Sequence, residues 1–174
     1  MQLDSLPAQM LLATARQAGS AAELRCFALL ARASTGVAIQ AAMQRDLARS
    51  GLTEPGFGIL SVLLAHDPEA VLRSDLAVAA GLSPMRTDDA LTRLEMSRLV
   101  QRHRDAEDRR LVWLHLTDAG KTRITGALRR YVTGSVLVTE SLNEQELAAS
   151  IEISTKLGQG AARLSVEPLI SAAN

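Results

Sequence analysis

The hydrophobic period of the sequence changes abruptly near Leu99, and this change limits the fold more than any other feature. Before it, core-facing positions recur at the three- and four-residue spacing of one helix face, at Thr87, Ala90, Leu91 and Leu94. After it, residues 99–104 and 111–116 alternate between two faces, and the polar residues 105–108 lie between the two stretches. The pattern therefore predicts a helix followed at once by a two-stranded hairpin.

A shorter helix is predicted just before this one. Ser74 and Asp75 open it, it extends to about Ala80, and Gly81 is placed to turn the chain. Ser83 and the proline after it then start the next helix, because a capping hydroxyl followed by proline at the first helical position is a typical helix start. Two helices joined by about three residues form a helix-turn-helix, and the hairpin behind them is its wing.

Longer helices are predicted on both sides of this region. They are a helix from Ser20, which has capping-box spacing to Glu23, to about Arg49; one capped by Thr53 that ends near His66; one from Thr117-Asp118 to about Val138; and a last one that starts at Asn143 and Glu146. We therefore expect a mainly α fold with a small β-hairpin wing in a single domain, 1–174. Residues 1–70 and 117–174 would form a helical dimerisation region, and residues 71–117 a winged helix-turn-helix DNA-binding region.

Composition excludes several functional classes. With only four aromatic residues among 174, the core must consist of small and branched aliphatic side chains on helices. The single cysteine predicts a cytoplasmic protein without disulfides or structural zinc, and neither a leader nor an uncharged membrane span is expected. His66, His103 and His115 fall on separate elements, so we expect no metal. Motifs for nucleophilic catalysis, phosphate binding or dinucleotide binding are missing, so neither an enzyme nor a cofactor is predicted.

The charges are unevenly distributed although the formal net charge is zero. Residues 73–130 carry 12 Lys and Arg against 8 Asp and Glu, whereas the remaining residues carry 7 against 11. A basic middle between acidic ends is weak support for a nucleic-acid partner, because a solvated helix face produces the same imbalance.

From Leu76 to Gly120 the sequence closely resembles the MarR family of bacterial transcription regulators. The resemblance is carried by the order of the two helices, by Asp108-Arg109-Arg110 and by Leu114-His115-Leu116-Thr117-Asp118-Ala119-Gly120. It implies a homodimer whose terminal helices interlock and whose two winged domains bind the half-sites of a palindromic operator in double-stranded DNA. It also implies a repressor that responds to a small-molecule effector. Apolar stripes on the first and last helices, which one small domain cannot cover, favour the same dimer.

The helix from Ser83 is expected to enter the major groove, with Arg86 as the best candidate for reading bases. Its other outward positions are Met85, Asp88, Asp89, Thr92 and Arg93, and the full set of predicted DNA-binding residues is Ser74, Ser83, Met85, Arg86, Thr87, Asp88, Asp89, Arg93, Arg104, Asp108, Arg109 and Arg110. Two residues depart from the family pattern, since Asp89 replaces a basic residue and Arg98 replaces a glycine at the helix end.

The acidic residues of this helix have two interpretations. Asp89 and Arg93 are four apart with the acid first, which favours a surface ion pair. Alternatively, Asp88 or Asp89 accepts a hydrogen bond from a cytosine amino group. A third hypothesis is that the two acids mark a winged helix that no longer binds DNA and serves as a protein-interaction module.

In the wing, Arg104, Arg109 and Arg110 flank a turn that can reach the minor groove, where the potential favours arginine. The resemblance implies that Arg110 inserts there and that Asp108 orients it. The alternative is a solvated hairpin in which Asp108 and Arg110 form an ion pair.

Cys26 lies where the organic-hydroperoxide-sensing branch of the family has its sensor cysteine. That branch supports its thiolate with tyrosines from the first helix, whereas this chain has Leu30 and Gln40 there, so an inert core cysteine is favoured over thiol-based redox sensing. By family analogy alone, an effector pocket is expected to be lined by Cys26, Leu30, Phe57, Ser61 and Trp113.

Overall fold

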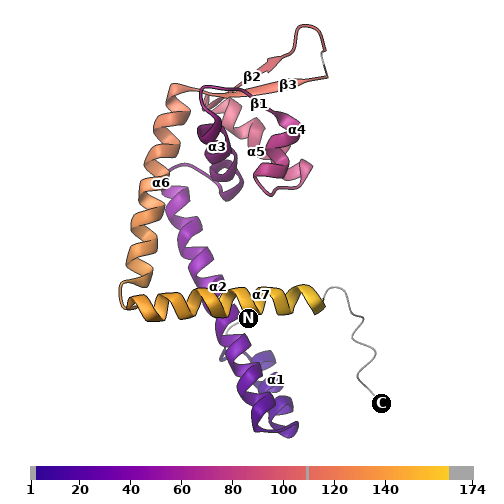
Figure 1. Ribbon diagram of the computed structural model, residues 1–174, viewed down its shortest axis with the longest axis vertical. Helices are drawn as coiled ribbons and strands as arrows, with labels where there is room; N and C mark the ends of the chain where they lie inside the picture. Colours follow the sequence, from indigo (N-terminus) through magenta and orange to yellow (C-terminus); the bar gives the residue numbers. More distant parts are fainter. Residues whose placement is uncertain (1–2, 109, 165–174) are drawn as a thin grey trace. The chain divides into compact units, whose positions relative to one another are not determined.

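The computed structural model describes residues 3–108 and 110–164 (Figure 1). Its elements are α1 (Leu6–Gln17), α2 (Ser20–Arg49), α3 (Glu54–His66), β1 (Val71–Leu72), α4 (Arg73–Ala79), α5 (Pro84–Met96), β2 (Val100–Arg104), β3 (Val112–Leu116), α6 (Asp118–Thr139) and α7 (Glu144–Leu164). The mainly helical fold with a small β wing is thus confirmed. Internal contacts divide the chain into two units, residues 1–134 and 135–174.

Most helix ends lie where the sequence predicts them. Thr53 Oγ1 accepts the N–H of Gly56 at 3.2 Å and caps α3, and Thr117 Oγ1 accepts the N–H of Gly120 at 2.9 Å at the start of α6. The predicted cap at Ser20 is wrong. Gly19 is the N-cap of α2 and makes no side-chain cap, because Glu23 instead binds the Arg16 guanidinium of α1 at 2.6 Å.

Two elements were not predicted from the sequence. The first is α1, which packs against α2 within the first unit. The second is β1, whose two residues pair antiparallel with Leu114 and Trp113 of β3, so the sheet order is β1-β3-β2. β2 and β3 pair from Val100 opposite Leu116 to Arg104 opposite Val112, which confirms the predicted hairpin. Because β1 directly precedes α4, its pairing with β3 attaches the wing to the start of α4.

The core of the first unit lies among α3, α4, α5, the sheet and the start of α6 (Figure 1). Its most deeply buried large aliphatic side chains are Ile59, Leu60, Leu63, Leu76, Leu91, Leu114 and Ile124. α6 starts tightly against the wing, because a Cβ on Gly120 would lie 2.1 Å from the carbonyl oxygen of Leu99. This packing fixes α5 and the wing to one small scaffold.

The described part of the second unit comprises the last turn of α6 and α7. The predicted start of α7 is confirmed as a capping box, since Asn143 Oδ1 accepts the N–H of Glu146 at 3.0 Å and Glu146 Oε2 accepts the N–H of Asn143 at 2.9 Å. Apolar side chains along α7, including Ile151 and Ile153, are exposed.

α2 is apolar but exposed. One 18-residue window within it has a mean hydropathy of 1.4, and none of that window is buried, so by length and composition the helix would also pass as a membrane span. The large apolar side chains that α2 exposes are Leu24, Phe27, Leu29, Val37 and Ile39. An exposed apolar face of this size indicates a surface that a partner covers.

Candidate DNA-binding face

α5 presents one polar face to solvent and buries the other. Ser83 caps it, since Ser83 Oγ lies 3.5 Å from the N–H of Arg86, and Met85 is 73% exposed. Arg86, Asp89, Thr92 and Arg93 are also exposed. Placing Thr87 among the DNA-binding residues was wrong. This side chain is 1% exposed, and its hydroxyl donates to the carbonyl oxygen of Ser83 at 3.0 Å.

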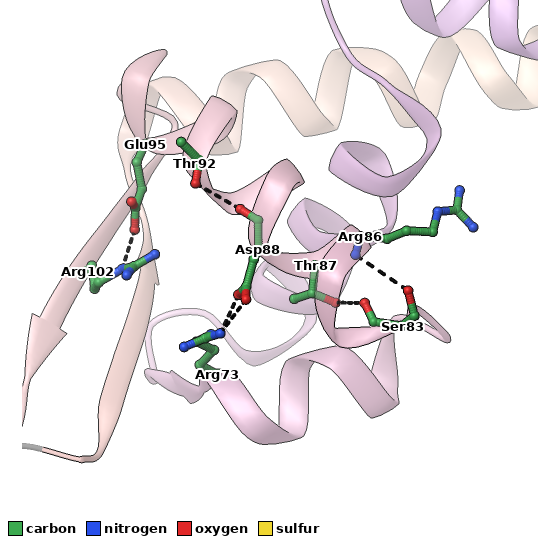
Figure 2. Close-up of polar contacts among 8 residues, drawn as sticks. All are labelled: Arg73, Ser83, Arg86, Thr87, Asp88, Thr92, Glu95 and Arg102. Atoms are coloured by element: carbon green, nitrogen blue, oxygen red, sulfur yellow. Dashed lines mark hydrogen bonds and ion pairs between the residues drawn. The ribbon is translucent and has the colours of Figure 1, made fainter.

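Asp88 is held by an arginine from another element. Arg73, the first residue of α4, places its Nη2 at 2.5 Å and 2.6 Å from the two carboxylate oxygens of Asp88 (Figure 2). The side chains are 43% and 46% exposed. Arg73 was not among the DNA-binding residues predicted from the sequence. One feature of the sequence could have indicated this pair. Arg73 is a cation in the first turn of a helix, where it opposes the helix dipole and is stabilised by an acidic partner.

The expected ion pair between Asp89 and Arg93 does not form. Among the residues that the structure describes, no ion pair joins these two side chains, although both border one shallow surface hollow with Arg86. Asp89 therefore remains an exposed carboxylate beside two arginines. It is the neighbouring Asp88 that is paired.

The wing tip is organised by Asp105. Its Oδ1 accepts the N–H groups of Glu107 at 2.9 Å and of Asp108 at 3.1 Å, and its Oδ2 accepts the indole N–H of Trp113 at 3.2 Å. These donors lower the pKa of Asp105, the Asp108 N–H most, then those of Glu107 and Trp113. From the sequence, Asp105 was predicted only to be part of a polar turn.

Two of the three arginines predicted for the wing lie within the described residues, and both are exposed. Arg104 and Arg110 are exposed, whereas Arg109 lies outside the described residues. Asp108 Oδ1 accepts the backbone N–H of Arg110 at 2.9 Å, and no side-chain ion pair joins them within the described part of the wing. Asp108 thus fixes the backbone from which Arg110 projects. The alternative hairpin with an Asp108–Arg110 ion pair is not the one seen.

A hollow of about 380 Å³ separates the wing from α4 and α5. Arg73, Ser74, Asp88 and Arg110 contribute its polar lining, and Ser74 donates its hydroxyl hydrogen to Asp75 at 3.0 Å. A second arginine is neutralised nearby, since Arg102 of β2 donates to Glu95 of α5 at 2.6 Å (Figure 2). The face therefore combines arginines that are paired within the protein with exposed ones that form no ion pair with an acidic side chain in the described chain: Arg86, Arg93, Arg104 and Arg110.

Comparison with known proteins identifies this architecture. No family model matches the sequence. The HTH-type transcriptional repressor MdtR of Bacillus subtilis (strain 168) is 28% identical over 123 residues, which are 71% of this chain and 78% of MdtR. The solved structure of AbsC, a MarR family transcriptional regulator from Streptomyces coelicolor, is 25% identical with a TM-score of 0.65 and covers 80% of this chain and 93% of AbsC. The chain thus resembles winged-helix regulators of the MarR family in both sequence and fold.

A third relative is the S. aureus MepR–DNA complex, which shares the fold. It is 21% identical with a TM-score of 0.64, and the match covers 74% of this chain and 96% of MepR. MarR-family proteins are transcription regulators and not enzymes, in agreement with the sequence analysis.

The chain has a cavity of about 500 Å³ bordered by α2, α3, α5 and α6. Its lining includes Ile39, Gln40, Met43, Gln44, Leu47, Glu54, Phe57, Leu82, Arg86 and Tyr131. The rings of Phe57 and Tyr131 stack with their centroids 5.5 Å apart.

Of the five side chains expected to line an effector pocket, Phe57 is the one that lines this cavity. Cys26 and Leu30 lie on α2 before the first lining residue. Ser61 donates its hydroxyl hydrogen to the carbonyl oxygen of Phe57 at 2.8 Å, and Trp113 is bound to Asp105 in the wing. The structure therefore does not bring the five together, because α2 is long enough to carry its first turns away from α3.

In the described residues, neither Cys26 nor the histidines belong to a cluster of side chains that could bind a metal ion. Cys26 is a half-buried free cysteine. Within residues 3–108 and 110–164, no group of three or more His, Cys, Asp and Glu side chains is placed to hold a metal ion. His66 Nδ1 lies 2.8 Å from the carbonyl oxygen of Val62 in its own helix, which suits a structural histidine.

Proposed function

We propose that the chain is a repressor that binds a palindromic operator in double-stranded DNA as a homodimer. The exposed arginines carry this proposal, because they lie on the two elements that a winged helix presents to DNA. Arg86 and Arg93 lie on α5, and Arg104 and Arg110 lie on the wing. α5 would occupy the major groove, where Arg86 in its first turn would read base edges.

The wing would contribute a minor-groove contact through Arg110. Its backbone is held by Asp108, and the turn before it is organised by Asp105, so the exposed side chain starts from an ordered hairpin. An arginine in a narrow minor groove gains from the negative potential there. Sequence-independent affinity would come from phosphate contacts and would fall steeply with salt.

The test is a binding titration with a duplex from the intergenic region beside the gene. Arg110→Ala is expected to weaken binding about tenfold, in the range of a good groove contact, without lowering the melting temperature appreciably. Arg32→Ala, which removes an arginine of α2 outside the wing and α5, is the control for charge. Equal affinities of wild type and Arg110→Ala would refute the minor-groove role, and binding that does not respond to salt would favour the protein-interaction module instead.

The dimer would cover the exposed apolar side chains of the long helices. Leu24, Phe27 and Val37 of α2 are 69%, 47% and 59% exposed, and Tyr131 and Val132 of α6 are also exposed. Burying such side chains against a second copy is worth about 25 cal/mol per Å². Sedimentation should give a dimer in detergent-free buffer. A monomer, or recovery only with membranes, would contradict this proposal.

The cavity beside α3 would hold the effector. Arg86 is part of its lining and lies in the first turn of α5, so an occupant can contact the residue proposed to read the operator. The mixed lining of aliphatic, aromatic and amide side chains favours a small apolar molecule with a hydrogen-bonding or anionic group. Met43→Trp would fill the cavity, and we expect it to abolish release of the operator by an effector while leaving the dimer intact.

A further inference from the structure

The pair of Asp88 and Arg73 is a feature of the DNA-binding face that a role in reading bases does not explain. Both carboxylate oxygens of Asp88 face the guanidinium of Arg73, at 2.5 Å and 2.6 Å (Figure 2). A carboxylate used in this way is poorly placed to accept from a cytosine amino group as well. The pair instead lies at the hollow between α5 and the wing, which Arg110 also lines.

In the proposed complex, that hollow would lie beside the DNA backbone. With α5 in one groove and the wing in the next, the phosphates between the grooves pass along the surface that joins them. Arg73 and Arg110 are the cations that line the hollow. An unpaired Arg73 would therefore be a phosphate ligand, and Asp88 cancels its charge at this position.

We propose that Asp88 lowers the electrostatic, sequence-independent part of the DNA affinity, by neutralising Arg73 and so removing one phosphate contact from the complex. This inference rests on the proposed DNA-binding function. Phosphate contacts supply nearly all sequence-independent binding, so their loss weakens binding to random DNA while base contacts through Arg86 remain. The carboxylate therefore lowers the affinity for operator and random DNA alike, and base contacts supply a larger share of the binding energy that remains.

The pair is weak enough for substitution to release the arginine without unfolding the domain. Both side chains are nearly half exposed, and exposed ion pairs contribute little to stability. Asp89 gives a matched control, because it lies on the same helix, carries the same charge and has no ion pair with Arg93 in the described chain. Asp88→Asn and Asp89→Asn remove equal charge, but Asp88→Asn alone frees an arginine.

The experiment measures Kd for a random-sequence duplex and for the intergenic duplex at several salt concentrations. Each added phosphate contact steepens the salt dependence of log K by about 0.9. We expect Asp88→Asn to steepen it by about that amount, and to bind the random duplex at low salt about threefold more tightly than Asp89→Asn does. Asp88→Ala is the second variant, and circular dichroism checks that both are folded.

Arg73→Ala completes the test in two backgrounds. In the wild type it should leave the salt dependence unchanged, since Arg73 makes no phosphate contact there. In the Asp88→Asn background it should remove the added increment of about 0.9. Equal salt dependence for Asp88→Asn and Asp89→Asn would overturn this inference but not the proposed function. A weaker salt dependence after Arg73→Ala in the wild type would do the same. A wild type without salt-dependent duplex binding would instead overturn the proposed function.

Discussion

Arg98 closes α5 in a backbone conformation that costs energy, and replacing it by glycine should stabilise the protein. Its φ is 57°, in the left-handed region. The N–H of Arg98 bonds to the carbonyl oxygen of Glu95 and the N–H of Leu99 to that of Leu94, both at 2.9 Å, which is a Schellman motif. α2 and α4 end in the same way, but with Gly51 at φ 68° and Gly81 at φ 64°.

The magnitude follows from two opposing terms. A non-glycine residue in the left-handed region costs about 1–2 kcal/mol. Glycine offsets about 0.5–1 kcal/mol of the stability gained by removing this strain, because it gives the unfolded chain more conformational freedom. Arg98→Gly should therefore raise the free energy of unfolding by about 0.5–1 kcal/mol, equivalent to about 1–4 °C in melting temperature for a chain of this size.

The assay is thermal unfolding by circular dichroism at one fixed protein concentration, because the stability of a dimer depends on concentration. Arg98→Ala separates the backbone from the side chain, since alanine keeps the strain and should bring no gain. Gly81→Ala is the reverse experiment: an added Cβ there meets nothing within 4 Å, so its expected net loss of about 0.5–1 kcal/mol contains the same two backbone terms and no steric clash. If Arg98→Gly and Arg98→Ala had equal melting temperatures, the strain argument would be refuted.

Three further predictions concern the scaffold. Gly120→Ala should destabilise the fold by about 3 kcal/mol, because its Cβ would lie 2.1 Å from the carbonyl oxygen of Leu99; near-normal denaturant unfolding would contradict this packing. Thr53→Ala should cost about 1 kcal/mol through loss of the α3 cap, measured in the same way, whereas Thr53→Ser should cost little. Since the folded-state pKa of Asp105 is lowered, wing order should persist as pH falls through the ordinary aspartate range and be lost only below it, reported by the fluorescence of the single tryptophan, Trp113. A midpoint at or above the ordinary aspartate pKa, or an identical profile for Asp105→Asn, would count against this.

Much of the face could be predicted from the sequence because its signals are local. Capping side chains act on N–H groups two or three residues away, so Thr53, Ser83 and Thr117 mark helix starts without knowledge of the fold. The departure at Arg98 was also visible as a missing glycine. Thr87 shows the limit of a motif, because its spacing placed it on the core face while its position in the recognition helix suggested DNA, and the packing of α5 buries it.

The sequence by itself determined the helices and strands other than α1 and β1, the caps at Thr53, Ser83 and Thr117, and the exposed positions of Arg86 and Arg110, since these depend on spacing within one element. Only the tertiary structure decided which charges remain available. Arg73 reaches Asp88 across 15 residues, and the cavity gathers side chains from Ile39 to Tyr131. Such contacts depend on how helices cross, and crossing is set by the packing of the whole core, which no local pattern encodes.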